Sequence, residues 1–213
     1  MSTFNDIDIA CEKCGHEFRG TIWTAVNARQ DPELKDILLG GELNMVMCPE
    51  CGHVAFQDHF VLYQDPESEL VAYIYPARHE PERDTLQAQM LKGFREAQEV
   101  FEKTKRLDYD PVLVFGLESL VKMIDSEALR AAQSDVAQAV CEENHIPFTA
   151  LRPSLARKRS LPRVLPVNAA SKTIERASLL EGLAKLLAAN PTLDLYRSLQ
   201  KTVEAGPGWL LER

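Results

Sequence analysis

The first eighty residues carry short apolar runs and a loose alternation of apolar and polar positions, a pattern typical of strands. Residues 7–27 alternate around a cysteine-containing turn, which predicts two short strands joined by a tight turn. Residues 43–47 predict a third strand, and residues 54–63 and 70–75 predict two more that form a hairpin. We therefore expect a β-rich, antiparallel N-terminal part.

Residues 32–39 predict one short helix between these strands. Asp31 occupies the N-cap position, Pro32 the first helical position, and Glu33 adds a negative charge to the first turn. Gly40-Gly41 follows the last apolar residue and is a typical helix end.

Residues 84–107 have a helical pattern, because their apolar residues recur every three or four positions. We interpret this segment as a helix packed against the sheet. A coiled-coil dimer is the alternative, but two heptads are fewer than the three or four that usually indicate one. The apolar stripe consists of Leu86, Met90, Phe94, Ala97 and Phe101.

The rest of the chain predicts mainly helices. Residues 112–115 predict a strand, and the predicted helices cover residues 117–131, 134–144, 172–189 and a last segment from Asn190-Pro191 to about Gly206. Residues 152–166 are rich in basic residues and proline, which favours an exposed linker.

These elements predict an α+β fold: a zinc-ribbon-like antiparallel β-rich part with an inserted helix, followed by a mainly helical part. We expect a first domain at residues 1–130 and a helical region at residues 131–213.

The composition indicates the class of protein and its cellular compartment. The chain has 213 residues, 45% of them hydrophobic and 26% charged, which is typical of a globular protein. No segment approaches the ~20 apolar residues of a membrane span, and residues 1–10 lack the pattern of a signal peptide. We therefore expect a cytoplasmic protein without a membrane partner, in which disulfides are disfavoured.

Charge is unevenly distributed along the chain. Residues 1–80 contain 5 Lys+Arg and 14 Asp+Glu, whereas residues 81–213 contain 19 and 18. Nucleic-acid affinity depends on contacts between basic side chains and phosphates, so the acidic N-terminal part is a poor candidate for DNA or RNA binding.

The cysteines of this acidic part form a repeated motif. Cys11-x2-Cys14-Gly-His recurs as Cys48-x2-Cys51-Gly-His. Two residues between cysteines let both thiolates reach one ion from a tight turn, and the glycine permits the backbone conformation that directs amides at the sulfurs. Four thiolates make a closed tetrahedral shell of the structural zinc kind, with Zn–S bonds of ~2.3 Å and one Zn²⁺ per chain.

Other uses of these cysteines fit less well. Four thiolates also suit a rubredoxin-like iron centre, which stays open as the alternative. Thioredoxin-like chemistry uses one CxxC at a helix start, and c-type haem attachment needs histidine directly after the second cysteine, where this chain has glycine. A disulfide pair is disfavoured in a reducing compartment.

The two histidines of the motif, His16 and His53, are expected to lie outside the filled ligand set, either on the surface or beside the ligands as donors to a sulfur or a carbonyl. A zinc ion with four protein ligands has no open position at which to activate water, which argues against a metallohydrolase.

The fifth cysteine, Cys141, precedes two glutamates and lies four residues before His145. Nearby carboxylates raise the pKa of a thiol, so we expect a buried core residue rather than a nucleophile.

One basic cluster offers a contact with nucleic acid or with an acidic partner. No aromatic residue is interleaved with it, and a solvated linker is the simpler interpretation. The cluster consists of Arg152, Arg157, Lys158, Arg159 and Arg163.

The motif resembles that of the bacterial CpXC domain family, named for paired Cys-Pro-x-Cys turns. The resemblance covers residues 5–130 and includes Asn27, Asp31-Pro-Glu-Leu-Lys, Gly41-Glu-Leu-Asn44, Leu62-Tyr-Gln-Asp65 and Val114-Phe-Gly-Leu-Glu-Ser-Leu120. The second cysteine turn has the proline, whereas the first reads Cys-Glu-Lys-Cys and loses turn rigidity but no ligand. The resemblance implies metal binding and supplies no activity.

We therefore expect a non-enzymatic structural-zinc protein that serves as a protein-interaction or regulatory module, with an unidentified protein partner or self-association. A nucleic-acid-binding protein that uses residues 152–163 and a rubredoxin-like electron carrier are the alternatives.

Overall fold

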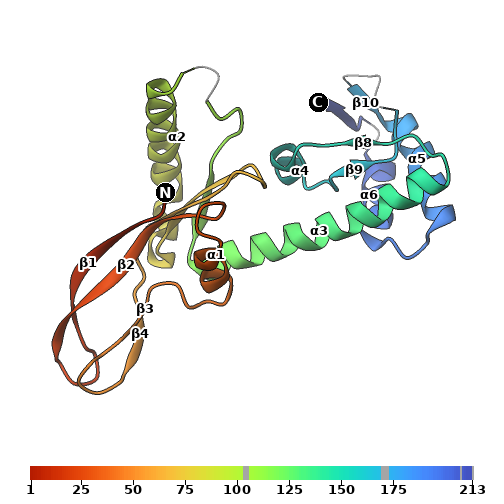
Figure 1. Cartoon of the computed structure of the whole chain (residues 1–213). Coiled ribbons are helices and arrows are strands. Elements are labelled where there is room, and N and C mark those ends of the chain that lie inside the picture. The colour runs from red at the N-terminus through yellow and green to blue at the C-terminus, as the bar shows by residue number, and fades with distance from the viewer. Residues whose placement is uncertain (103–105, 169–172, 207, 213) are drawn as a thin grey trace. The chain divides into compact units, whose positions relative to one another are not determined.

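The computed structural model describes residues 1–102, 106–168, 173–206 and 208–212. The chain forms two compact units, Met1–Met123 (unit 1) and Ile124–Arg213 (unit 2). Figure 1 shows the strands of unit 1 and the helices of unit 2, and the predicted α+β class is confirmed. Among the described residues, no helix is both long and apolar enough to cross a membrane.

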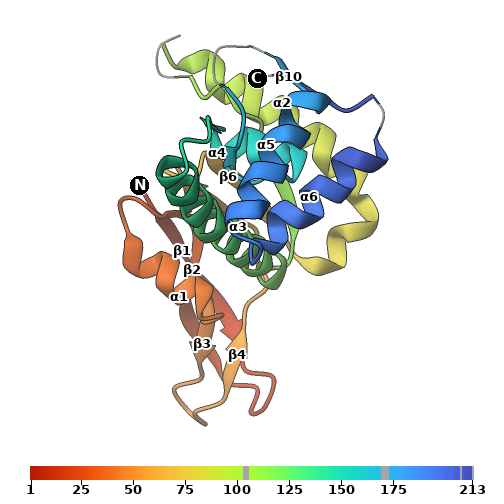
Figure 2. The ribbon, with the colours of Figure 1, turned by 90° about the vertical axis from the view of Figure 1, so that its right-hand side faces the viewer.

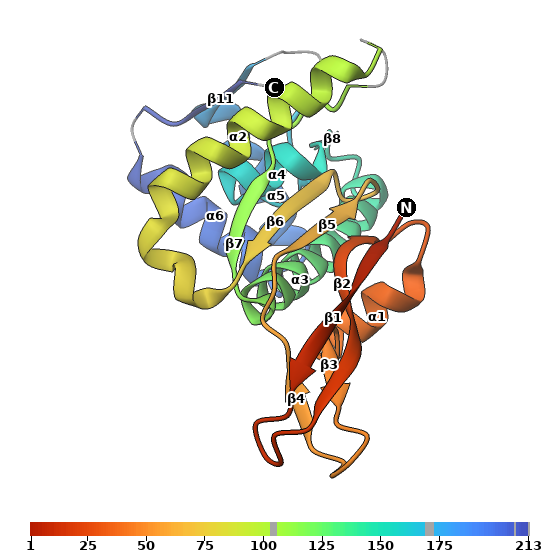
Figure 3. The ribbon, with the colours of Figure 1, turned by 90° about the vertical axis from the view of Figure 1, so that its left-hand side faces the viewer.

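Unit 1 is built on a five-stranded sheet with the order β1-β2-β5-β6-β7 (Figure 3). Its strands are β1 (Thr3–Ala10), β2 (Glu17–Asn27), β5 (Val61–Asp65), β6 (Leu70–Tyr75) and β7 (Val112–Phe115). The sheet is mixed rather than wholly antiparallel, because β2 pairs with β5 and β6 pairs with β7 in parallel. Parallel neighbours need a long crossover connection, and both connections contain a helix.

A second, two-stranded sheet consists of β3 (Met45–Met47) and β4 (Val54–Phe56). The single strand predicted over residues 54–63 is therefore wrong: β4 and β5 belong to different sheets. The chain leaves β4 at Gln57, whose N–H donates to the Asn44 carbonyl at 2.9 Å. Continuous alternation in the sequence hides this change of partner.

The predicted helix at residues 32–39 is confirmed as α1 (Pro32–Leu39), with Gly40 at its C-cap. Asp31 occupies the N-cap position, but its side chain makes no capping bond. Its carboxylate instead accepts from the backbone N–H of Ser2 at 3.3 Å, which ties the N-terminus to the start of α1.

The helix predicted to reach residue 107 is α2 (Arg83–Val100), preceded by the 3₁₀ turn η1 (Ala77–Glu82). Phe101 is already extended, and the Arg106 guanidinium donates to its carbonyl at 3.2 Å. A basic side chain that reaches back to the last carbonyls replaces the missing helical bonds. Leu86 and Met90 of the predicted stripe are buried, whereas Ala97 and Phe101 are exposed. Residues 103–105 of the prediction lie outside the described residues.

The two helices predicted over residues 117–131 and 134–144 are one, α3 (Leu117–Glu143). Ser134 lies at the expected break, but its hydroxyl donates to the Arg130 carbonyl at 2.8 Å, one turn earlier. This bond satisfies the polar side chain inside the helix.

Unit 2 packs the rest of the chain around one apolar core. Its further elements are β8 (Thr149–Ala150), α4 (Pro153–Arg159), β9 (Val164–Leu165), β10 (Thr173–Glu175), α5 (Arg176–Ala189), α6 (Asp194–Ala205) and β11 (Leu210–Glu212). The core includes Leu165, Leu179, Leu183, Leu186 and Tyr196, all fully buried.

The helix predicted from residue 172 begins at Arg176, since residues 173–175 pair with β11 as β10. Residues 169–172 lie outside the described part of the chain. The last helix begins at Asp194, because Asn190 instead forms a turn in which its side chain accepts from the Thr192 N–H at 3.0 Å.

Candidate metal centre

The first cysteine turn joins β1 to β2. The Gly15 N–H donates to the Cys11 carbonyl at 2.8 Å, and the Cys11 N–H donates to the His16 carbonyl at 2.9 Å. Gly15 has φ +73°, a conformation that favours glycine. The turn therefore projects both sulfurs from the end of the β1–β2 hairpin.

The second turn joins β3 to β4 and repeats this geometry. The Gly52 N–H donates to the Cys48 carbonyl at 2.9 Å, and the Cys48 N–H donates to the His53 carbonyl at 2.8 Å. Gly52 has φ +68°. Figure 2 shows the β3–β4 hairpin beside β1 and β2, with the two cysteine loops at the same end.

Packing between the hairpins brings the two loops together. A Cβ on Gly20 of β2 would lie 2.5 Å from Ile9 Cδ1 and 3.5 Å from Val46 Cγ1. The missing side chain of Gly20 thus leaves room for Ile9 of β1 and Val46 of β3. Ile9 and Val46 line a small cavity beside Cys11 and Cys48, which joins the apolar packing directly to the cysteines.

The four sulfurs form a compact group. The Cys11 and Cys51 sulfurs are 3.6 Å apart, the Cys14 and Cys48 sulfurs are 3.7 Å apart, and all four lie within 4.8 Å of one another. A tetrahedron with ~2.3 Å metal–sulfur bonds has edges of about 3.8 Å, whereas a disulfide bond is only ~2.05 Å long. The group therefore fits a metal ion, and the four cysteines could hold one.

The acidity of the thiols differs within the group. The Cys14 and Lys13 N–H groups direct hydrogen bonds at the Cys11 sulfur and, against the cost of burial, lower the pKa of Cys11 to about 6. The His16 N–H favours the thiolate of Cys14, but burial and the three neighbouring sulfurs outweigh it and raise the pKa of Cys14 to about 12. Four thiolates this close repel one another, so all four can be ionised together only with a cation between them. A bound metal ion supplies that cation and binds the deprotonated sulfurs.

The two motif histidines contribute backbone carbonyls to the turns, as described above. Among the described residues, the group that could hold a metal contains the four cysteines and neither imidazole. The His16 ring stacks near Phe18, with 6.4 Å between ring centroids. That the His16 and His53 side chains donate hydrogen bonds to a sulfur or a carbonyl beside the metal stays a prediction.

Cys141 lies in unit 2, fully buried in the core. Burial raises the pKa of its thiol, and the charge of Glu142 raises it further. This is the environment of an inert core cysteine.

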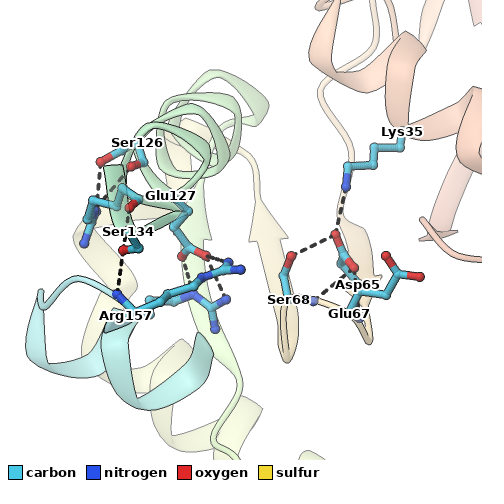
Figure 4. Close-up of polar contacts among 10 residues, drawn as sticks. Lys35, Asp65, Glu67, Ser68, Ser126, Glu127, Ser134 and Arg157 are labelled. Carbon is cyan, nitrogen blue, oxygen red and sulfur yellow. Dashed lines mark hydrogen bonds and ion pairs between the residues drawn. The ribbon is translucent and has the colours of Figure 1, made fainter. Parts of the chain in front are cut away.

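The sequence predicted that the basic cluster lies in an exposed linker, and this prediction is wrong. Pro153–Arg159 forms α4, and Arg157 makes a two-pronged ion pair with Glu127 of α3 (Figure 4). Both side chains are nearly buried, with exposed fractions of 11% and 12%. Arg163 approaches the same carboxylate at 4.0 Å. The glutamate that pairs with the cluster comes thirty residues earlier, so the local sequence gives no sign of it.

Arg152, Lys158 and Arg159 are exposed. The nucleic-acid alternative therefore loses Arg157 and weakens at Arg163, since these two residues serve an ion pair inside unit 2.

The sequence does not reveal the hydrogen bonds that two buried polar residues of unit 1, Asn44 and Asp65, make with other elements. Asn44 is buried, has φ +63°, and joins β3 to β2 through its side chain. Its amide oxygen accepts from the Trp23 N–H at 2.7 Å, and its amide nitrogen donates to the Trp23 carbonyl at 3.0 Å. Asparagine tolerates a positive φ better than most residues. An asparagine directly before a predicted strand is therefore the one sign of this conformation in the sequence.

Asp65 ends β5 and organises the turn into β6 (Figure 4). Its carboxylate accepts from Lys35 Nζ at 2.9 Å and from the N–H groups of Glu67 and Ser68 at 3.2 and 3.3 Å. Burial alone would raise the pKa of Asp65, but the bonds from Lys35 and Ser68 outweigh it and lower the pKa. Asp65 thereby joins α1 to the β5–β6 hairpin. The Asp-Pro sequence predicts the turn between these strands but not the ion pair with Lys35.

Comparisons with known proteins give one result. No curated protein and no solved structure matches the chain. A family model described as CpXC protein matches residues 9–140, which include both cysteine turns, the whole sheet of unit 1 after the start of β1, and most of α3. Because this match covers more than half of the chain, the chain belongs to the CpXC protein family.

Proposed function

We propose that the four cysteines hold one structural zinc ion, and that the protein is a non-enzymatic module that binds another protein. The observation that carries the proposal is the convergence of four thiol sulfurs from two matching turns. Four thiolates fill the tetrahedral shell that zinc prefers, so no position is left for water or substrate. The metal then holds the two hairpins together.

Iron at the same four thiolates is the competing assignment, because a tetrahedral sulfur site suits both metals. It makes the protein an electron carrier rather than a binding module. A coloured protein with iron in place of zinc would favour that alternative.

The experiment compares the wild type with C48S and with C141A as a matched control. Cys48 lies in the sulfur group, whereas Cys141 lies in the core of unit 2. We expect C48S to lose the metal and C141A to retain it. Structural zinc contributes folding free energy, so the metal-free wild type and C48S should show a lower melting temperature by circular dichroism.

Two results would contradict the proposal. One is a metal-free wild type whose spectrum and melting temperature equal those of the metal-bound protein. The other is a C48S variant that retains a full equivalent of metal.

A further inference from the structure

The β3–β4 hairpin presents a continuous apolar face to solvent. Met45 pairs with Phe56 across the two strands, and Met47 pairs with Val54. These four side chains, which we call the outer face, are 45%, 44%, 66% and 47% exposed in that order. Val46 and Ala55 alternate with them and line the cavity beside Cys11 and Cys48. The hairpin therefore has one side toward the metal centre and the other uncovered.

A contiguous apolar face in contact with water differs from single exposed apolar residues. Scattered apolar residues are normal on a protein surface, whereas contiguous ones mark interaction sites. Methionine has three rotatable bonds and a polarisable sulfur, so a methionine pair adapts to different apolar partners. The outer face combines both features in a hairpin held by the candidate metal centre.

Charge indicates the chemistry of the occupant. No lysine or arginine occurs between residues 36 and 77, whereas seven acidic residues do. Glu42 and Glu50 are exposed and lie in sequence on either side of β3. Four thiolates around a divalent cation add a net charge of about −2 at the loop end. A partner with basic residues beside its apolar side chains would be attracted, and an acidic one repelled.

A second copy of the chain fits poorly on the same grounds. Two outer faces would bring like charges together. Stable interfaces bury about 800 Å² per partner from roughly 20–30 residues a side, whereas the outer face has only four residues. A face this small suits a short segment.

We propose that the outer face is a docking site for a short amphipathic segment of another protein, with two or three apolar side chains flanked by lysine or arginine. β3 has three residues and spans about 10 Å. Two turns of a helix, with a pitch of ~5.4 Å, match that length. The inference rests on the proposed function, because the metal centre holds the hairpin in place.

The test uses a fluorescein-labelled amphipathic peptide of leucine and lysine, with a leucine and glutamate peptide of the same pattern as its control. Binding is measured by fluorescence anisotropy to the wild type, to M45T/M47T, and to L129A/V136A. Leu129 and Val136 are exposed apolar residues of unit 2, with exposed fractions of 63% and 47%, so they form a matched control. Metal content is measured for every sample.

We expect the lysine peptide to bind the wild type and L129A/V136A equally, and M45T/M47T at least tenfold more weakly, with full metal content in all three. The glutamate peptide should not bind. Equal binding by M45T/M47T, or no binding by the metal-loaded wild type, would overturn the docking site. A wild-type dimer in sedimentation that M45T/M47T abolishes would overturn it in favour of a second copy.

Failure of the two proposals is distinguishable. A wild type that contains no zinc but still binds the peptide through Met45 and Met47 contradicts the structural-zinc proposal and supports the docking site. A zinc-loaded wild type whose binding ignores both methionines supports the zinc and contradicts the docking site.

Discussion

The Asn44 side chain attaches the residue before β3 to β2 through two hydrogen bonds. β5 pairs with β2 only over Ala25–Asn27, so Trp23 has no partner in β5. The Asn44 amide bonds with the Trp23 N–H and carbonyl instead. A side chain thereby completes the strand edge.

Two substitutions of Asn44 separate the effect of its hydrogen bonds from the effect of its positive φ. N44A loses both hydrogen bonds and strains a left-handed backbone, so we expect it to lower the free energy of unfolding by about 3 kcal/mol. N44G loses the bonds but tolerates the backbone, and should be about 1 kcal/mol less damaging than N44A. Urea unfolding measures both. Variants as stable as the wild type would show that the amide does not join the strands.

Asp65 makes a stability prediction that depends on pH. Its pKa is lowered in the folded protein, so its ion pair contributes above the unfolded pKa of about 4 and is lost as the pH falls through the folded pKa. D65N should cost about 2–4 kcal/mol near neutral pH, and the difference from the wild type should shrink below about pH 4.

The control for this prediction is E67Q. Glu67 lies in the same turn but its side chain is exposed, so E67Q should change stability by less than about 0.5 kcal/mol. Urea unfolding at several pH values measures both variants. A constant difference between D65N and the wild type across the acid range would contradict the account.

The sequence predicts the cysteines and misses Asn44 and Asp65 as anchors for a physical reason. Two cysteines in one tight turn act together through local spacing, which a sequence shows directly. The partners of Asn44 and Asp65, Trp23 and Lys35, come from other elements. Only folding brings them within hydrogen-bond distance.

Among the described glycines, Gly182 of α5 lies closest to the backbone of another segment. A Cβ on Gly182 would lie 1.6 Å from the Pro166 carbonyl oxygen and 2.7 Å from its carbonyl carbon. A backbone group cannot move aside as a side chain end can. Glycine therefore allows α5 to pack against the segment that follows β9.

G182A should lower the free energy of unfolding by about 3 kcal/mol or more, because the added methyl group overpacks a buried contact. G93A is the matched control: Gly93 is also in a helix, α2, but nothing lies within 4 Å of an added Cβ. Helix propensity alone should make G93A more stable by up to about 1 kcal/mol. Equal effects of the two substitutions in thermal unfolding would contradict the packing argument.

At this scale, local signals predict some elements and long-range partners decide others. Pro32 and the glycines that follow Leu39 predict the bounds of α1 correctly, and a short apolar run predicts β7. The break predicted near residue 133 is absent because the Ser134 hydroxyl bonds within the helix. The basic segment forms α4 because Glu127, far away in sequence, pairs with Arg157. Charge that is neutralised by a distant residue looks like exposed charge in a sequence.

The whole molecule consists of two units, and both bury apolar side chains. Among the described residues, the candidate metal centre belongs to unit 1. Each unit contains one of the two tryptophans: Trp23 packs edge-on against Phe4 in unit 1, and Trp209 packs against the core of unit 2. Fluorescence can therefore report on each unit separately.

Removal of the metal should affect the two units unequally. In W209F, where Trp23 is the reporter, a chelator should change the emission spectrum and lower the unfolding midpoint, because structural zinc supplies folding free energy. In W23F, where Trp209 is the reporter, the emission spectrum and the unfolding midpoint should stay unchanged. Equal responses from the two tryptophans would contradict a metal that stabilises unit 1 alone.

The most direct test of the central claim is the metal content of the untagged wild type, purified from cells supplied with both zinc and iron. Our account predicts about one zinc per chain, with four cysteines protected and Cys141 as the remaining thiol. Iron in place of zinc would contradict the structural role and indicate an electron carrier. A metal-free protein with oxidised cysteines would contradict the metal centre itself.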